Sequence, residues 1–166
     1  MTAPEPPLAR AKAIALRQLA ARMRTEAQIR VRLAREDLAG EADAVVAWLR
    51  ELRYLDDEAY ARARARDLVG AGRYGPRQAS QRLVRDGIPP DRARAALSEA
   101  LCADGARDAA TAELALCRVL AARRARGQAL SDLDDRARAR LARFLAGRGF
   151  SGRVVAAVLG VYEDGE

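Results

Sequence analysis

The sequence predicts an all-α protein made of three tandem three-helix repeats, nine helices in all, that form an elongated, curved array. Apolar residues recur at helical spacing along nearly the whole chain, and no segment shows the two-residue alternation of a β-strand. One pattern also occurs three times: a leucine, three further residues, a residue that ends a helix, and a large apolar residue. Its copies are Leu33–Leu38, Leu83–Ile88 and Leu145–Phe150, which begin 50 and 62 residues apart.

The composition favours small helical units that depend on their neighbours. The chain has 166 residues, enough for one ordinary domain or a short array of smaller ones. Half of the residues are hydrophobic, but alanine dominates them and aromatic residues make up only 4%. A three-helix unit of this composition buries a modest core, so we expect adjacent units to stack. The predicted divisions are a disordered start at residues 1–7, a first unit at 8–54, a second at 55–103, a third at 104–162 and a frayed tail at 163–166.

The first unit is predicted to contain three helices. The first ends near Met23, the second begins at Thr25, and the third spans residues 41–53. Thr25 and Gln28 match a capping box, in which the threonine hydroxyl accepts the N–H three residues on and the glutamine amide reaches back. The third helix carries an apolar stripe that we expect to end with Leu52.

The second unit centres on two helices joined by a glycine-rich turn. The acidic pair at residues 56–57 is predicted to cap the first of these helices, which runs to about Val69. Pro76 suits the first turn of the next helix, because its missing N–H leaves no donor unpaired. Gly87 is expected to adopt the left-handed conformation that ends that helix, with a sixth helix after the two prolines that follow.

The third unit is predicted to start with a long helix over residues 106–126, whose buried stripe begins at Ala110. Ser131 is predicted to cap the next helix, and Ser151 to cap the last one, on which Tyr162 lies inward.

Several motifs resemble nucleotide-binding or catalytic motifs, but their positions are better explained as the ends and caps of helices. Residues 70–75 and 147–152 have the glycine spacing of a dinucleotide-binding fingerprint, but that fingerprint requires a strand to enter the turn, and helices are predicted to enter both. The acidic pairs at residues 56–57 and 134–135 lie at predicted helix starts, and adjacent helical side chains diverge by about 100°. Capping is therefore favoured over paired-carboxylate catalysis.

The residue types needed for common catalytic and metal sites are scarce. The chain has no histidine, so it contains no Ser–His or Cys–His nucleophile and no zinc site that uses histidine. Cys102 and Cys117 lie on apolar helix faces without CxxC spacing, and we expect buried free thiols. We therefore expect a protein that is not an enzyme and that has no metal or cofactor.

Positive charge is the strongest functional signal. The net charge is +7 and the pI is about 10.3, which favours a polyanionic partner, nucleic acid first. Arginines concentrate in residues 22–35, 62–85 and 136–153. The competing interpretation is that arginine is merely abundant and that these faces are solvated. The predicted contact residues are Arg30, Arg32, Arg35, Arg62, Arg66, Arg73, Arg77, Arg82, Arg85, Arg140 and Arg148.

Four blocks of residues stand out along the chain: Leu19-x2-Arg22-x2-Thr25-Glu26-x2-Ile29-x3-Leu33, Leu52-x-Tyr54-Leu55-Asp56-Asp57-x2-Tyr60-Ala61, Gly75-Pro76-x6-Leu83-x3-Gly87-Ile88 and Leu145-x-Gly147-Arg148-Gly149-Phe150. On these blocks the chain resembles the RecX regulatory family, over about residues 12–160. Thr25 stands where serine is usual in that family, and the third unit matches more loosely. The order of the central blocks is fairly specific, although each block alone would be weak.

The resemblance implies a non-enzymatic modulator that binds the RecA–DNA filament in its helical groove and suppresses ATP hydrolysis, strand exchange and coprotease activity, so that it regulates DNA repair and recombination. The charge adds an expectation of weak, sequence-independent binding to single- and double-stranded DNA. We expect a cytoplasmic monomer without a membrane segment, since no apolar run approaches ~20 residues. Two alternatives remain: a helix-turn-helix DNA-binding regulator, and a helical scaffold that binds only proteins.

Overall fold

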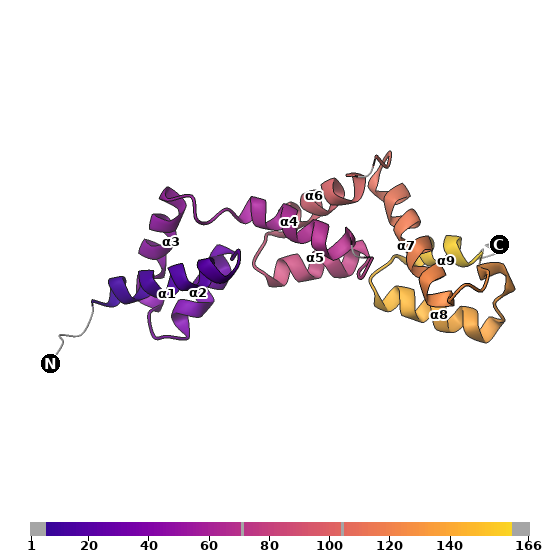
Figure 1. Cartoon of the computed structure of the whole chain (residues 1–166), viewed down its shortest axis with the longest axis horizontal. Coiled ribbons are helices and arrows are strands. Elements are labelled where there is room, and N and C mark those ends of the chain that lie inside the picture. Colours follow the sequence, from indigo (N-terminus) through magenta and orange to yellow (C-terminus); the bar gives the residue numbers. More distant parts are fainter. Residues whose placement is uncertain (1–5, 71, 104, 161–166) are drawn as a thin grey trace.

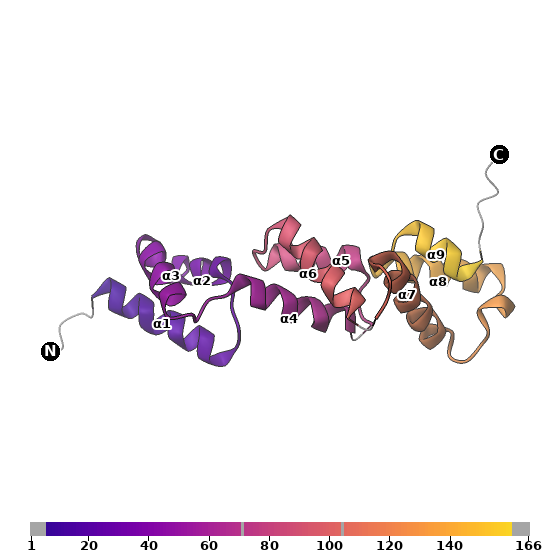
Figure 2. The ribbon, with the colours of Figure 1, turned by 90° about the horizontal axis from the view of Figure 1, so that it is seen from above.

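The computed structural model describes residues 6–70, 72–103 and 105–160, and the regular structure in these ranges is helical throughout. The described residues form nine α-helices, three to each unit, which confirms the predicted fold class. Figure 1 shows the units following one another along one long axis, and Figure 2 shows the same division from above. The predicted frayed tail and Tyr162 lie outside the described residues, as do residues 1–5. The helices are α1 (Pro7–Ala21), α2 (Glu26–Ala34), α3 (Ala42–Glu51), α4 (Asp57–Gly70), α5 (Pro76–Arg85), α6 (Pro90–Cys102), α7 (Ala109–Ala125), α8 (Asp135–Gly147) and α9 (Gly152–Leu159), with 3-10 turns at Ala39–Glu41 and Leu130–Asp132.

The threefold leucine pattern is the C-terminus of the second helix in each unit. The residue that ends the helix has a left-handed backbone, and the N–H of the next residue donates to the carbonyl of the leucine, as in a Schellman motif. The apolar residue that follows is buried in all three copies. The φ angles are 58° at Asp37, 97° at Gly87 and 91° at Gly149, and the N···O distances are 2.9 Å for Leu38, 3.1 Å for Ile88 and 3.3 Å for Phe150.

Each unit has a core of its own, in which alanines allow the helices to approach closely. The first core is built around Ile29, Leu33 and Leu49, which are almost completely buried. The second contains five buried alanines beside its leucines, and the third gathers around Phe150. Leu116 of α7 packs against both the second and the third core, so these two units share an apolar contact.

The second helices of the units, α2, α5 and α8, follow one another head to tail (Figure 1). The hydroxyl of Thr25, at the start of α2, donates to the carbonyl of Asp86, at the end of α5, at 2.5 Å. At the next junction the N–H of Gly75 donates to the carbonyl of Arg148 at 2.7 Å. Each junction therefore sets the negative end of one helix dipole against the positive end of the next.

Both junctions require glycine at the left-handed position. A Cβ atom on Gly87 would lie 2.2 Å from Cβ of Ala27, and one on Gly149 would lie 2.5 Å from the backbone nitrogen of Gln78. Positive φ and close approach thus coincide, which is the situation that only glycine tolerates.

Side-chain hydrogen bonds also connect the first two units. Two of the side chains in these bonds, those of Gln28 and Asp57, were predicted to cap their own helices, and this was wrong. The amide of Gln28 does not reach back within α2 but donates to Asp86 at 3.2 Å and to the hydroxyl of Tyr60 at 3.4 Å. Asp56 caps α4 as predicted, whereas Asp57 accepts the N–H of Glu26 at 3.0 Å and so caps α2 of the neighbouring unit. In both cases a partner from another unit replaces the local one.

The hydroxyl of Thr25, the proline at position 76 and the hydroxyl of Ser151 occupy the predicted helix starts. Three other predictions were wrong. Asp134, not Ser131, caps α8, because a 3-10 turn takes up the intervening residues. Leu52 follows α3 and is 44% exposed. Ala110 lies in the first turn of α7 and is exposed, whereas Cys117 and Ala121 further along the helix are buried.

Candidate polyanion-binding surface

The predicted contact arginines all lie in the described part of the chain, on α2, α4, α5 and α8 or on the turns next to them. Three of them are held by carboxylates, and one of these is Arg32, which pairs with Glu36 at 2.6 Å. Arg30 pairs with Asp43 at 2.6 Å, and Arg62 pairs with Glu58 at 2.6 Å and with Glu99 at 3.2 Å. Because their guanidinium groups already have anionic partners, Arg30, Arg32 and Arg62 are the weakest candidates for an external contact.

A row of arginines and aromatic rings crosses from the second unit to the third. The guanidinium carbon of Arg82 lies 4.0 Å from the ring centroid of Tyr74, and that of Arg148 lies 6.0 Å from the same ring. Arg148 also lies 5.0 Å from the ring of Phe144, and Arg124 lies 5.1 Å from it. Cation–π contacts with two rings therefore connect three guanidinium groups across the junction.

The turn before α5 adds a further constraint to this row. A guanidinium nitrogen of Arg148 donates to the carbonyl of Arg73 at 3.2 Å. The side chains of Arg73 and Arg77 are exposed beside it, and the backbone N–H of Arg77 donates to Gly149 at 3.2 Å. Arg73, Arg77 and Arg82 are thus brought together with Arg148 at the end of α8, whereas exposed Arg66 is on α4 and Arg85 is at the other end of α5.

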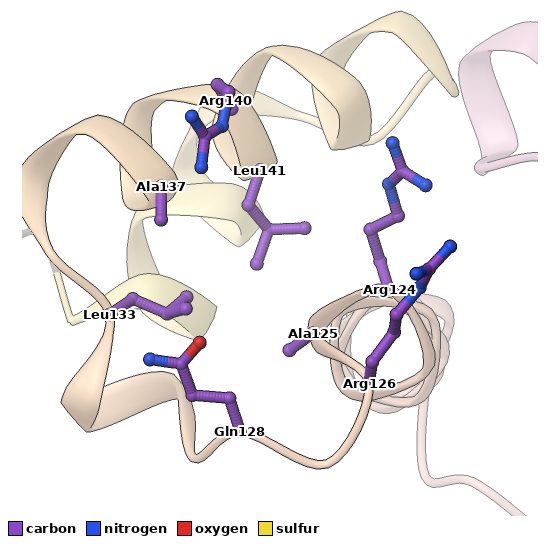
Figure 3. Close-up of a pocket in the computed structure, with 8 residues that line it drawn as sticks. All are labelled: Arg124, Ala125, Arg126, Gln128, Leu133, Ala137, Arg140 and Leu141. Atoms are coloured by element: carbon purple, nitrogen blue, oxygen red, sulfur yellow. The ribbon is translucent and has the colours of Figure 1, made fainter.

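Arg140 lies at a hollow of about 340 Å³ in the third unit, between the end of α7 and the start of α8. Figure 3 shows Leu133, Ala137 and Leu141 around the hollow, with Arg140 on the α8 side and Arg124 and Arg126 on the α7 side. This hollow has an apolar floor and a cationic rim. Its lining contains no carboxylate, thiol or hydroxyl group that could act in catalysis.

A groove of about 460 Å³ lies where the first unit meets the second. The predicted residues Arg32, Arg35 and Arg85 line it, the first two from α2 and its C-terminus and the third from α5. Arg22 and Arg24 also line it and were not among the predicted residues. They lie in the link between α1 and α2, and no pattern in the sequence indicates that this link faces the end of α5.

The other reactive groups are engaged in the structure of the protein. Cys117 is buried, and its burial raises the pKa of the thiol to about 11, so the nucleophilic thiolate is scarce at neutral pH. Within the described ranges no three His, Cys, Asp or Glu residues cluster closely enough to hold a metal ion. No helix in those ranges has the length and hydrophobicity to cross a membrane.

Comparison with known proteins gives one family throughout. Models of the first, second and third three-helix domains of RecX match residues 11–49, 56–97 and 111–159. Regulatory protein RecX from two strains of Thermus thermophilus is 37% identical over 140 residues, which is 84% of this chain and 83% of that protein. The crystal structure of RecX from Lactobacillus salivarius aligns with a TM-score of 0.71 and 19% identity, over 94% of this chain and 98% of that one. A crystal structure of regulatory protein RecX aligns with a TM-score of 0.73 and 25% identity, over 92% of this chain and 72% of that one.

Proposed function

The chain belongs to the RecX family, and we propose that it modulates the RecA recombinase without being an enzyme itself. In this proposal it binds the RecA–DNA filament and restrains RecA-dependent ATP hydrolysis, strand exchange and coprotease activity. The protein then acts in the cytoplasm, in DNA repair and recombination, as a monomer whose three units are residues 8–54, 55–103 and 104–162.

One structural observation supports this function best: arginines are repeated along an elongated array at the places where its units meet. The groove at the first junction and the row of Arg82, Arg148 and Arg124 at the second both present guanidinium groups. A filament is a repeating polyanion, and an array of similar cationic junctions can contact several of its phosphates or acidic side chains at once.

The choice of partner rests on the family rather than on the charge. Arginines at two junctions would also suit a DNA-binding regulator or a scaffold for acidic proteins. A DNA-binding regulator would prefer one duplex sequence, and a protein scaffold would ignore DNA. The proposed modulator instead binds DNA weakly and without sequence preference, and binds the RecA filament more tightly.

The first prediction is that the chain inhibits the DNA-dependent ATPase of RecA at substoichiometric concentration and hydrolyses no ATP by itself. One bound molecule that restrains a filament affects many RecA subunits, so each chain should inhibit more than one RecA subunit. ATP turnover is measured over a titration of the chain, with single-stranded DNA present and with RecA omitted as the control. Unchanged RecA turnover over the full titration would contradict the proposal.

A further inference from the structure

The groove between the first and second units collects positive charge from both of them. Arg22, Arg24 and Arg35 belong to the first unit, and Arg85 belongs to the second. Within the described residues, none of these four guanidinium groups has a carboxylate within 4.0 Å. The groove is therefore a place where charge has been gathered without being neutralised.

The acidic groups near this groove are already bound to other partners. Glu36 pairs with Arg32 at 2.6 Å and with Arg10 at 3.7 Å. Asp86 accepts hydrogen bonds from Tyr60 at 3.0 Å and from Gln28 at 3.2 Å, and it lies 3.5 Å from Arg64. Neither carboxylate is free to turn toward the four unpaired arginines.

The surroundings of Arg24 in this groove are unfavourable for its positive charge. One of its guanidinium nitrogens donates to Gln18 at 2.7 Å, while its Nε atom is buried without a hydrogen-bond partner. Burial, and after it the nearby charge of Arg22, lower the pKa of Arg24 from its ordinary value. An anion in the groove would offset both effects, because it would screen the repulsion between the arginines.

We infer that this groove binds the phosphate backbone of nucleic acid, with arginines of both units on successive phosphates. The lining also includes the carboxylate of Asp86, which is bound to Tyr60, Gln28 and Arg64. The remaining groups are small, apolar or amide side chains such as Ala27, Gln28 and Val31, and the lining contains no aromatic ring for base stacking. The groove is thus suited to backbone contact without sequence readout. The inference extends the proposed function, because it assigns the DNA of the nucleoprotein partner to a defined groove.

The test replaces the three exposed arginines together, as Arg22→Gln, Arg35→Gln and Arg85→Gln, and leaves half-buried Arg24 in place. The control replaces three exposed arginines away from the groove, as Arg17→Gln, Arg94→Gln and Arg153→Gln, which removes the same charge. Binding to a dye-labelled oligo-dT is followed by fluorescence anisotropy at several salt concentrations, without RecA. Circular dichroism checks that both variants fold.

We expect the groove variant to bind at least about tenfold more weakly, with a log–log salt slope that is shallower by about 0.7 for each phosphate that the variant no longer neutralises. The control should bind less than about threefold more weakly, since it removes the same charge from residues that do not line the groove. Equal weakening in the two variants would overturn the inference. So would a groove variant that keeps its affinity for oligo-dT but no longer inhibits RecA, because the groove would then serve an acidic protein surface. Groove-dependent DNA binding by a wild-type chain that does not inhibit RecA would support the groove and refute only the proposed function.

Discussion

The backbone of Gly87 lies so close to α2 that one added methyl group would decide how the first two units pack. We expect Gly87→Ala to destabilise the protein by about 1–2 kcal/mol through the strain of a left-handed alanine, and by more through the clash with Ala27. Gly127→Ala is the matched control, because φ is 88° there and no atom lies within 4 Å of the added Cβ. Urea denaturation gives both free energies of unfolding. If the two substitutions cost the same, the close approach of the units does not hold in solution.

The two cysteines should differ sharply in reactivity. Cys117 is buried and its raised pKa, about 11, keeps the thiol protonated, whereas Cys102 is half-buried. At about pH 8 we expect an alkylating reagent to label Cys102 first and Cys117 only when the third unit opens. Mass spectrometry of the digested protein locates the label, and the urea-unfolded chain, in which both thiols should react, is the control. Equal labelling rates in the folded protein would show that the third core is open.

At the scale of the element, Asp57 links two helices of different units, and its environment predicts a dependence of stability on pH. Desolvation is the main cause that raises the pKa of Asp57, and the N–H of Glu26 partly opposes it. The folded state therefore holds this proton more tightly than the unfolded state does, so the stabilisation from Asp57 is present at low pH and is lost as the pH rises through its folded pKa.

Asp57→Asn keeps an oxygen that can accept the N–H of Glu26 and removes the buried charge. We expect the variant to lose this part of the pH dependence and to be slightly more stable than the wild type near neutral pH. Urea midpoints measured from about pH 4 to 7 check this, because the difference between the two proteins should grow with pH. Parallel curves would mean that the carboxylate is well solvated in the folded protein.

The elements show which features a sequence can predict. The helix ends after Leu33, Leu83 and Leu145, and the left-handed conformation of Gly87, were predicted because the motif is local: a few residues contain the whole hydrogen-bond pattern. The amide of Gln28 and the carboxylate of Asp57 were assigned wrongly because their partners come from another unit. Arg22 and Arg24 were missed as candidate residues for the same reason, since the groove exists only after two units have met.

The whole molecule is a chain of separately packed units, and this predicts what can be removed from it. Leu116 is the one residue of α7 that packs against the second core, and no residue of α7 packs against the first. The groove between these two units is lined by no described residue of the third unit. A fragment that ends at residue 103 should therefore remain helical and unfold cooperatively, although the removal of Leu116 leaves Leu101 and Val69 less covered and lowers the melting temperature.

This fragment separates DNA binding from the restraint of the filament. It keeps the groove, so its affinity for oligo-dT should stay within about threefold of the full chain, while it lacks the arginines of α7 and α8 and the reach of a third unit. Inhibition of the RecA ATPase should then need at least about tenfold more protein, because the contacts of a linked array multiply. The complementary fragment, residues 55–160, lacks Arg22, Arg24 and Arg35 and should be weak in both assays. If the fragment ending at residue 103 inhibits RecA as well as the full chain does, the third unit takes no part in binding the filament, and the elongated shape needs another explanation.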